Sequence, residues 1–551
     1  RRYDIVYGDV MLNFNYNINR FDIAATVGWT GRYENMNNMR VSTNGGLVTE
    51  NWFDLNASRY TPSSTLQRME LLKTGYMGTL SLGWDNYLFL ELTGRQERSS
   101  TLKDQSFFYP SANLSFLFTQ AFHMPSWWNY GKLRLSYGIV GNAPETYTAN
   151  IVYEQGSDNG FTWNTIPSSW GNADIRPEKK YEYEIGLESK FLNNRLGIDI
   201  SYYNNRVKDQ ILSTPQPSTS GVKNVLMNVG EVANHGWDIS ISATPILTRD
   251  FRWDLTANYG VYKNKVVKLA DGVPYLEILN SGGSGIKIQA VEGQPMGDIY
   301  AQVPQVNENG EYLVSDKGLY LNQTELQKVG NINPAGVGGL FNSFSYKNVF
   351  LDFSIDFRIG GDVINEMNQY ATAVGLTPES LKYRDTEHGG LSYYYPGDNN
   401  SSGIPVQVDP STGAGPNGEI IYHDGIILPG VVASTGERNT RIIPAGYYYN
   451  TTYNWGTEAE QLTYRHSVFD NSYVKLRELT IGYQFPEKMI SKLGLGRLSV
   501  SVFGRNLFYF YKALKNYDAE SSVGTSWANQ ATVGSSTTAT RSFGVSLRAS
   551  F

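Results

Sequence analysis

Apolar and polar residues alternate one by one over the last nine positions of the chain. Phe543, Val545, Leu547, Ala549 and Phe551 occupy every second position, and glycine, serine or arginine fills each position between them. A period of two residues is the pattern of a β-strand that has one apolar and one polar face. Because the same alternation recurs along most of the chain, we predict a protein built largely from amphipathic strands.

The alternation predicts about 15 strands. Their expected positions are residues 12–18, 21–29, 76–84, 87–94, 112–118, 133–139, 181–187, 196–202, 225–243, 251–261, 340–346, 351–359, 473–485, 498–504 and 540–551. The connections between these strands alternate between short and long. Short turns are expected near Arg20, Asp85, Asn193, Thr248 and Lys347, with somewhat longer ones at 120–130 and 487–496. Long loops are expected at 30–72, 95–107, 141–180, 204–223, 263–338, 360–466 and 508–539.

This alternation of loop lengths indicates an outer-membrane β-barrel, in which tight periplasmic turns alternate with extended extracellular loops. A soluble β-sandwich has no reason to segregate its loops in this way. The polar strand faces carry charges such as Asp352, Asp356 and Arg358, and an arginine facing lipid at the bilayer centre costs about 2–4 kcal/mol. We therefore expect these faces to enclose a lumen. A soluble sheet would show the same alternation, so the loop lengths and the last strand decide between the two.

The last strand also gives a direction. A C-terminal strand that ends on phenylalanine is typical of bacterial outer-membrane barrels, where it ends at the periplasmic side. Counting back through the expected strands then places residues 1–9 in an extracellular loop. A closed single-chain bacterial barrel has an even number of strands, so the odd count predicts that this chain is part of a larger barrel.

Composition narrows the class of protein further. The mean hydropathy is −0.37, and no run approaches the roughly 18 apolar residues of a membrane-spanning helix. Aromatic residues make up 13% of the chain, which suits interfacial girdles or a carbohydrate-binding surface. The absence of cysteine excludes disulfides and thiolate sites, and the net charge of −6 argues against a nucleic-acid partner. Residues 1–4 lead into no apolar stretch of the kind found in signal peptides.

Several stretches resemble segments of SusC/RagA-type TonB-dependent transporters, in the family's order and over nearly the whole chain. These stretches are residues 132–142 (KLRLSYGIVGN), 228–239 (NVGEVANHGWDI), 292–297 (EGQPMG), 338–362, 473–483 (YVKLRELTIGY) and 504–520. The resemblance implies an all-β transmembrane antiparallel barrel of 22 strands, plugged like other barrels of that width. Residues 1–551 are then its C-terminal portion, with the plug domain and about seven strands expected before Arg1.

The resemblance also implies a function. It predicts an importer of the cell outer membrane that takes up oligosaccharides or peptides in a TonB-dependent manner. The expected partners are a SusD-like surface lipoprotein, the TonB complex through the missing N-terminal part, outer-membrane lipids and the glycan or peptide. A dimer of transporter–lipoprotein pairs fits the same family. Two rival functions stay open: a transporter-like barrel that acts as a structural scaffold in a surface assembly complex, and a soluble all-β carbohydrate-binding protein.

Candidate substrate contacts are aromatic residues of the long loops, because flat rings stack on sugars or cover peptide side chains. They are Trp163, Trp170, Tyr394, Tyr395, Tyr448 and Trp455. Packing of the loops on themselves, or docking of the lipoprotein, would use the same residues. Trp127 and Trp128 lie beside a periplasmic turn and are instead expected to be interfacial anchors.

The sequence predicts no enzyme activity, no cofactor and no metal site. The five histidines are scattered without metal-ligand spacing, and no motif of a serine or metal hydrolase occurs. Glu182 and Glu184 share one strand face, which is a weak glycosidase signal. Many relatives carry an acidic, calcium-binding type of loop that corresponds here to residues 305–310 and Asp316. Two of its usual acidic positions are amides in this chain, so calcium is not expected.

Overall fold

The computed structural model describes residues 1–103, 106–158, 161–216, 218–281, 285–397, 399–454, 463–522, 524, 526–534 and 539–551. The chain divides into two compact units. Unit 1 comprises Arg1–Ser242 and Tyr262–Pro274, and unit 2 comprises Ala243–Val261 and Tyr275–Phe551. Strands dominate both units. No helix in the described ranges is long and apolar enough to cross a membrane.

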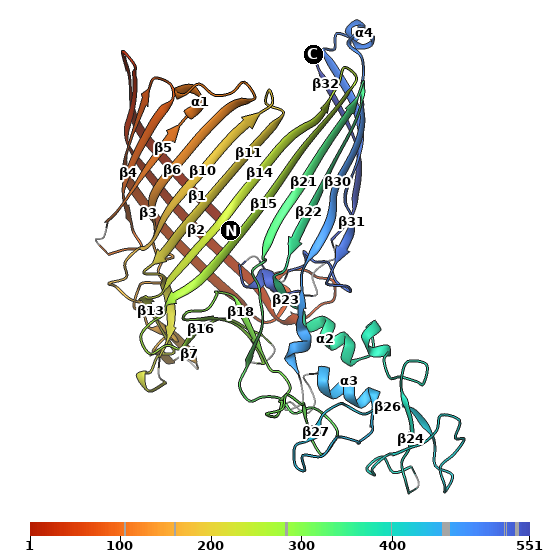
Figure 1. Cartoon of the computed structure of the whole chain (residues 1–551). Helices are drawn as coiled ribbons and strands as arrows, with labels where there is room; N and C mark the ends of the chain where they lie inside the picture. The colour runs from red at the N-terminus through yellow and green to blue at the C-terminus, as the bar shows by residue number, and fades with distance from the viewer. Residues whose placement is uncertain are drawn as a thin grey trace. The chain divides into compact units, whose positions relative to one another are not determined.

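Fifteen strands form one large sheet, in which they follow one another in chain order (Figure 1). They are β1 (Arg2–Ile18), β2 (Phe21–Leu47), β3 (Ser58–Trp84), β4 (Leu88–Ser99), β5 (Ser106–Phe116), β6 (Trp128–Asn142), β10 (Glu178–Phe191), β11 (Leu196–Lys208), β14 (Glu231–Leu247), β15 (Phe251–Lys268), β21 (Gly336–Tyr346), β22 (Val349–Ile359), β30 (Tyr473–Gln484), β31 (Arg497–Lys512) and β32 (Ser542–Ser550). Every strand expected from the sequence overlaps one of these, with one expected strand broken in two as described below, so the all-β prediction is confirmed.

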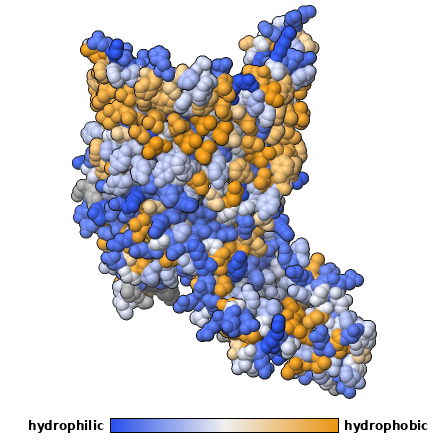
Figure 2. All heavy atoms as spheres, in the orientation of Figure 1, coloured by the Kyte–Doolittle hydropathy of each residue, from blue (hydrophilic) through white to orange (hydrophobic). Residues whose placement is uncertain are grey.

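Pairing in register keeps the two faces of the sheet distinct. Between β31 and β32, Val502 pairs with Val545 and Ser501 pairs with Ser546, and the two strands run antiparallel without a bulge. A shift by one residue would bring every apolar side chain to the polar face. The apolar side chains of β32 are open, with Val545 72% exposed. In each unit, apolar residues gather in a band across the strands (Figure 2), which is the surface that a bilayer covers.

The short turns depend on residues that tolerate a left-handed backbone. Asn19 has a φ of 53°, and Asp85 and Asn86 have φ values of 50° and 58°. Asparagine and aspartate adopt this conformation more readily than other non-glycine residues because their side chains hydrogen-bond locally. Each of these turns joins two strands of the sheet, and in both units the short turns lie at one end of the strands (Figure 1).

Two expectations about the first residues are wrong. Residues 2–9 belong to β1 and pair with residues 30–37 of β2, so they are not an extracellular loop. The expected loop at 30–72 shrinks to the connection between Leu47 and Ser58, because β2 and β3 continue as a two-stranded ribbon. Beyond Asn37 of β2 and before Lys73 of β3, these strands pair only with each other in the described part of the sheet. Because polar residues lie on both faces of this ribbon, its sequence does not show the alternation of apolar and polar residues that predicts a strand.

The expected single strand at 225–243 is also wrong. It is interrupted at Val229 and Gly230, where the glycine has a φ of +93° that a residue with a side chain rarely adopts. The part before the break is β13 (Asn224–Asn228), which leaves the large sheet and pairs with β12 (Ile211–Pro215) and β9 (Ser169–Trp170). The part after it is β14.

The connections between the large-sheet strands contain small elements of their own, most of them in the long loops. In unit 1 these are α1 (Phe118–Ala121), β7 (Glu154–Asp158) and β8 (Phe161–Thr165), together with β9, β12 and β13. In unit 2 they are β16 (Tyr275–Ser281), β17 (Ile286–Val291), β18 (Asp298–Ala301), β19 (Leu313–Val314), β20 (Gln327–Asn331), β23 (Asp362–Ile364), α2 (Glu366–Ala373), β24 (Leu391–Tyr394), β25 (Val406–Gln407), β26 (Tyr422–Ile426), β27 (Val431–Val432), β28 (Ile443–Pro444), α3 (Ala445–Tyr453), β29 (Val468–Asp470) and α4 (Glu487–Ile490).

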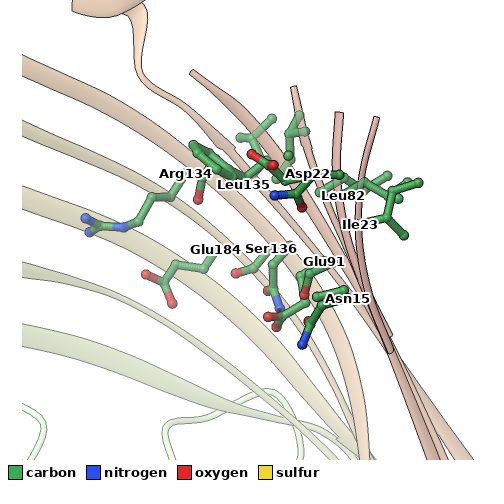
Figure 3. A pocket seen from close by; sticks show the side chains of 18 residues that line it. Asn15, Asp22, Ile23, Leu82, Glu91, Arg134, Leu135, Ser136 and Glu184 are labelled. Atoms are coloured by element: carbon green, nitrogen blue, oxygen red, sulfur yellow. Dashed lines mark hydrogen bonds between the residues drawn. The ribbon is translucent and has the colours of Figure 1, made fainter. Parts of the chain in front are cut away.

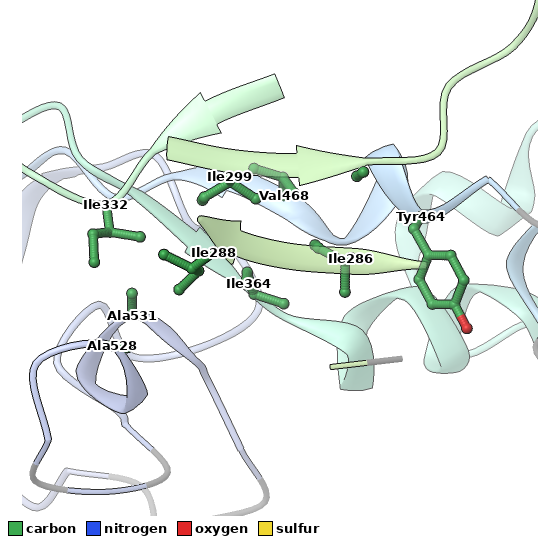
Figure 4. Close-up of a cluster of buried hydrophobic side chains, with 10 residues drawn as sticks. Ile286, Ile288, Ile299, Ile332, Ile364, Tyr464, Val468, Ala528 and Ala531 are labelled. Carbon is green, nitrogen blue, oxygen red and sulfur yellow. The ribbon is translucent and has the colours of Figure 1, made fainter. Parts of the chain in front are cut away.

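Unit 2 has its main buried core in these loops rather than in the large sheet. Ile286 and Ile288 of β17, Ile299 of β18 and Ile364 of β23 are fully buried and pack together (Figure 4). Each buried isoleucine contributes about 1.5–3 kcal/mol relative to an exposed one. The long connections therefore form a folded layer that has its own hydrophobic core.

Candidate functional site: a polar hollow on the unit 1 sheet

The polar face of the unit 1 sheet carries a hollow of about 800 Å³. Its lining comes from β1, β2, β3, β4, β5, β6 and β10. Figure 3 shows Arg134, Glu184 and Glu91 projecting to one side of the sheet, whereas Ile23 lies on the other side. The sheet thus presents charged and amide groups on one face and aliphatic groups on the other, as the alternation predicts.

Strand register explains why these polar groups meet. Seven residues lie side by side in one row across seven strands. They are Asn15, Ala24, Ser81, Glu91, Asn113, Ser136 and Glu184. Directly opposed side chains on one sheet face lie about 4.5–5.5 Å apart, so the six polar residues form a row that is interrupted only by Ala24. Within the row, the amide of Asn113 donates to Glu91 over 3.3 Å.

A glycine lets the single arginine of the hollow reach across a strand. Arg134 on β6 pairs with Gly186 on β10, and a Cβ atom at Gly186 would lie only 2.8 Å from the Arg134 guanidinium. Without that atom, the guanidinium crosses β10 and binds Asp199 on β11 through both terminal nitrogens, at 2.6 and 3.2 Å. Glu188 lies 3.6 Å away. The arginine charge is therefore balanced by acids outside the hollow.

The hollow is acidic on balance as a result. Its lining includes the carboxyl groups of Asp22, Glu91 and Glu184 in addition to Arg134. Glu182, the second member of the predicted carboxylate pair, is held by Lys180 at 2.5 Å and is not part of the lining. This surface suits a ligand or a protein segment rich in hydrogen-bond donors, because carboxylates act only as acceptors.

The predicted aromatic contacts lie in two separate places. Trp163 on β8 is 46% exposed, and Trp170 on β9 makes an edge-to-face contact with Tyr153 at 6.2 Å; both belong to unit 1. In unit 2, Tyr394 ends β24 and Tyr395 follows it, buried against other tyrosines. Tyr448 lies in α3. Trp455 lies outside the described residues.

The unit 2 tyrosines pack mainly on each other. Tyr395 contacts Tyr393 and Tyr422 with centroid distances of 5.5 and 5.9 Å, and Tyr448 contacts Tyr449 at 5.1 Å. Burial is the main cause that raises the pKa of Tyr449 to about 12. For these residues the geometry favours packing of the loop on itself, one of the roles expected from the sequence.

Trp127 and Trp128 stack on each other beside the longer connection before β6, at a centroid distance of 6.0 Å. Trp127 is 52% exposed and also stacks on Phe191 at the end of β10. Exposed aromatic rings at one end of membrane strands are typical of an interfacial girdle.

The segment that corresponds to a calcium loop in relatives forms a tight turn here. The side-chain oxygen of Asn307 accepts hydrogen bonds from the backbone N–H groups of Asn309 and Glu311. Within the described residues, no group of three or more histidine, aspartate or glutamate side chains is arranged to hold a metal ion.

Sequence reasoning missed a cluster of charges in unit 2. Lys475 of β30 lies 2.6 Å from Glu520, and Arg477 binds the same carboxylate at 2.6 and 2.8 Å and Asp356 of β22 at 2.5 Å. Burial disfavours the charged form of Glu520, but the hydrogen bonds from Arg477 and Lys475 outweigh it and lower its pKa to about 2. The cluster fastens the long loop after β31 to the strands. The sequence signal that could have indicated this cluster was the pair of cations, Lys475 and Arg477, within one strand.

Comparisons with known proteins agree with this architecture. The family described as "TonB dependent receptor-like, beta-barrel" matches residues 1–299, which is more than half of the chain. The TonB-dependent receptor P3 of Formosa agariphila is 24% identical over 494 residues, covering 82% of this chain and 42% of the relative. The TonB-dependent receptor SusC of Bacteroides thetaiotaomicron is 30% identical over 247 residues, covering 41% of this chain and 24% of the relative.

Among solved structures, the RagAB peptide transporter is similar over 94% of this chain and 53% of its own, with a TM-score of 0.68 and 18% sequence identity. That likeness concerns the fold. The chain spans less than half the length of the curated relatives it matches. A soluble carbohydrate-binding protein is excluded, because the family match covers the strands of the large sheet from β1 to β15 and barrels of this family lie in the outer membrane. The chain belongs to the TonB-dependent receptor-like β-barrel family, of the SusC/RagA type, and its large sheet is made of outer-membrane β-barrel strands.

Proposed function

We propose that the protein imports oligosaccharides or peptides across the outer membrane, driven by TonB and assisted by a SusD-like surface lipoprotein. The observation that carries this proposal is the acidic hollow on the polar face of strands that belong to a TonB-dependent receptor barrel. A polar face turned away from lipid provides a path for hydrophilic solutes. Support comes from the similarity to SusC and to a complex described as a peptide transporter. The proposal assigns no catalytic step to the chain.

We further propose that residues 1–551 are the C-terminal portion of the barrel. In the described residues β1 pairs with β2 alone and β32 pairs with β31 alone, and a membrane strand with an open edge would leave backbone groups unpaired in lipid. Additional strands that pair with these edges would satisfy those groups. A plug domain would then lie against the polar face and meet the row that includes Glu91 and Glu184.

The test uses cells that express the full-length protein together with a candidate SusD-like lipoprotein. Uptake of labelled oligosaccharides and peptides is measured with and without a functional TonB complex, and the receptor is purified in mild detergent to identify co-purifying chains. Import predicts TonB-dependent uptake and a co-purifying lipoprotein. A lipoprotein complex without any uptake would instead support the scaffold function.

The two loop tryptophans of unit 1 can be tested in the same assay. If Trp163 and Trp170 contact the solute, alanine at either position should lower uptake several-fold, because each stacked ring contributes about 0.5–1.5 kcal/mol. Trp127→Ala, at the short-turn end, is the matched control and should leave uptake unchanged. Unaltered uptake by both loop variants would remove these two residues from the path.

A further inference from the structure

The short connections at one end of the unit 2 strands are rich in cations. These connections are residues 248–250, 347–348 and 485–496. They carry four basic side chains, which we call the basic rim: Arg249, Lys347, Lys488 and Lys492. Asp250 and Glu487 are their two acids, whereas the chain as a whole has a net charge of −6. We propose that the basic rim binds the headgroups of anionic phospholipids. The inference goes beyond import and does not depend on it.

The charges of the basic rim are open to a ligand. All four side chains are exposed, and in the described part of the chain Arg249, Lys488 and Lys492 form no ion pair. On the neighbouring strand the cation is paired, because Arg252 binds Asp254 at 2.5 Å. A lysine or arginine without an acid of its own can donate charged hydrogen bonds to the phosphate of a ligand.

The basic rim lies next to an apolar row of the large sheet. Strand register places six residues side by side on the apolar face: Phe251, Tyr346, Val349, Tyr483, Val500 and Leu547. Leu547 is 68% exposed and Tyr346 is 55% exposed. Lys347 follows Tyr346 directly, and its ammonium lies 5.5 Å from the centroid of that ring. Tyrosine at the end of membrane strands lies at the level of the lipid headgroups, so the cations lie within reach of phosphate.

The connection after β30 presents two of these cations around an exposed apolar side chain. α4 continues into a 3-10 turn over Ser491–Leu493, which Gly494 ends with a φ of 71°. Ile490 is 3% exposed and holds the segment in place, whereas Met489 is 62% exposed. Lys488 and Lys492 are about one helical turn apart. An exposed methionine between two lysines fits the boundary between acyl chains and headgroups.

The position of α4 agrees with this role. It lies beyond the ends of the unit 2 strands, on the side of the short turns (Figure 1). At this end, hydrophilic residues border the apolar band of the strands (Figure 2). Consecutive short connections are separated by two strand spacings in the sheet order, which is about 10 Å. The basic rim can therefore contact several headgroups along the edge of the membrane.

Charge selects the class of lipid. The phosphate of phosphatidylglycerol leaves a net negative charge, whereas phosphatidylethanolamine carries an ammonium group that cancels it. Each lysine or arginine near a membrane surface raises the affinity for anionic lipid about fivefold. The basic rim should therefore collect phosphatidylglycerol from a mixture of the two lipids.

The test records which lipid touches residue 489. The full-length receptor carries the photoreactive residue p-benzoylphenylalanine in place of Met489 and is reconstituted in nanodiscs with equal amounts of phosphatidylglycerol and phosphatidylethanolamine. After irradiation, mass spectrometry gives the ratio of the two lipid adducts. We expect at least about five phosphatidylglycerol adducts for each phosphatidylethanolamine adduct. In about 1 M salt the ratio should fall toward one, because the Debye length shrinks to about 3 Å.

Two pairs of substitutions localise the selectivity. Lys488→Gln together with Lys492→Gln should bring the ratio close to one. Lys382→Gln together with Lys515→Gln is the matched control, because it removes two exposed lysines from the long connections of the same unit. The control should keep the ratio of the unaltered receptor. Heat-modifiable gel migration establishes that each protein is folded.

Each outcome bears on the proposal. A ratio near one in the unaltered receptor would overturn it, and so would an unchanged ratio in Lys488→Gln/Lys492→Gln or an equal fall in the control. The absence of lipid adducts would place residue 489 away from the membrane and would also overturn it. The same irradiation in living cells tests another occupant, since a discrete protein adduct in place of lipid would assign the surface to a protein. Uptake is not part of any readout, so failure of the import function would leave the lipid site standing.

Discussion

A nearly buried lysine shows how single residues organise the outer part of unit 2. The Lys475 side chain is 2% exposed, and its ammonium is neutralised by Glu520 from a loop 45 residues away. An unpaired ammonium in such surroundings would cost several kcal/mol. Sequence reasoning could not find this pair, since only the fold of the loop after β31 brings the two residues together. The same holds for Arg134, whose reach depends on a glycine in a neighbouring strand.

Replacing Glu520 tests the cluster. Glu520→Gln should destabilise the attached loop by about 1–2 kcal/mol, a value reduced from that of a fully buried pair because one third of the Glu520 side chain is exposed. Hydrogen exchange of residues 513–522 should become faster, while exchange in the strands stays slow. Glu308→Gln, in an exposed turn of the same unit, is the control.

The pH dependence has a defined sign. Because the pKa of Glu520 falls to about 2 in the folded protein, below the usual value of about 4.3, its contribution is present above that usual value. It is lost as the pH falls through about 2. Because the intrinsic exchange rate itself changes with pH, protection factors are compared. Those of the loop should fall between these two pH values in the unaltered protein and change less in Glu520→Gln. An equal fall in both proteins would contradict the assignment.

At the scale of the element, each strand has one face toward lipid and one face toward the polar interior. Val545 and Ser546 are neighbours in β32, but their side chains point to the apolar and the polar face. Arginine at residue 545 would place a charge in lipid and should lower stability by about 2–4 kcal/mol. The fraction of folded barrel, read from heat-modifiable gel migration, should fall.

Ser546→Arg is the matched control, because it adds the same side chain one residue away on the polar face. It should leave the folded fraction close to that of the unaltered protein. If both variants folded equally well, or if only the residue 546 variant failed, the assignment of the two faces would be reversed or wrong.

Strands with one apolar face were the elements that the sequence could predict. Periodicity located β32 and its neighbours because lipid and lumen impose opposite polarity on alternate residues. It failed for the outer halves of β2 and β3, where both faces meet water and no alternation is imposed. It also failed at Gly230, where a backbone conformation rather than polarity ends β13. The role of the aromatic residues was harder to predict than the strands. A run of tyrosines such as 393–395 has the same sequence whether the rings bind a solute or pack on each other.

At the scale of the whole molecule, the two ends of the sheet strands carry different connections. The chain has no cysteine, so a single introduced thiol reports its side of the membrane without background. Ala433→Cys, in the long connection before β28, should react with a membrane-impermeant maleimide on intact cells. Arg249→Cys, in the short turn between β14 and β15, should react only after the cells are disrupted. Both positions are exposed.

Labelling of both residues on intact cells, or of Arg249→Cys alone, would contradict the proposed orientation. A protein with neither position reactive on intact cells, but both reactive after lysis, would not have reached the surface. The family match covers residues 1–299, so labelling at residue 433 extends the assignment into a part of the chain that the match leaves untouched.

The two-stranded ribbon formed by the outer halves of β2 and β3 has a mechanical consequence. A pair of strands twists more strongly than a wide sheet and is at best marginally stable by itself in water. Its connection carries Trp52 and Phe53, which are 50% and 87% exposed. Proteases added to living cells should therefore cleave this ribbon before any other part of the β1–β6 region. A binding partner that holds the tip of the ribbon would transmit force along it to the sheet.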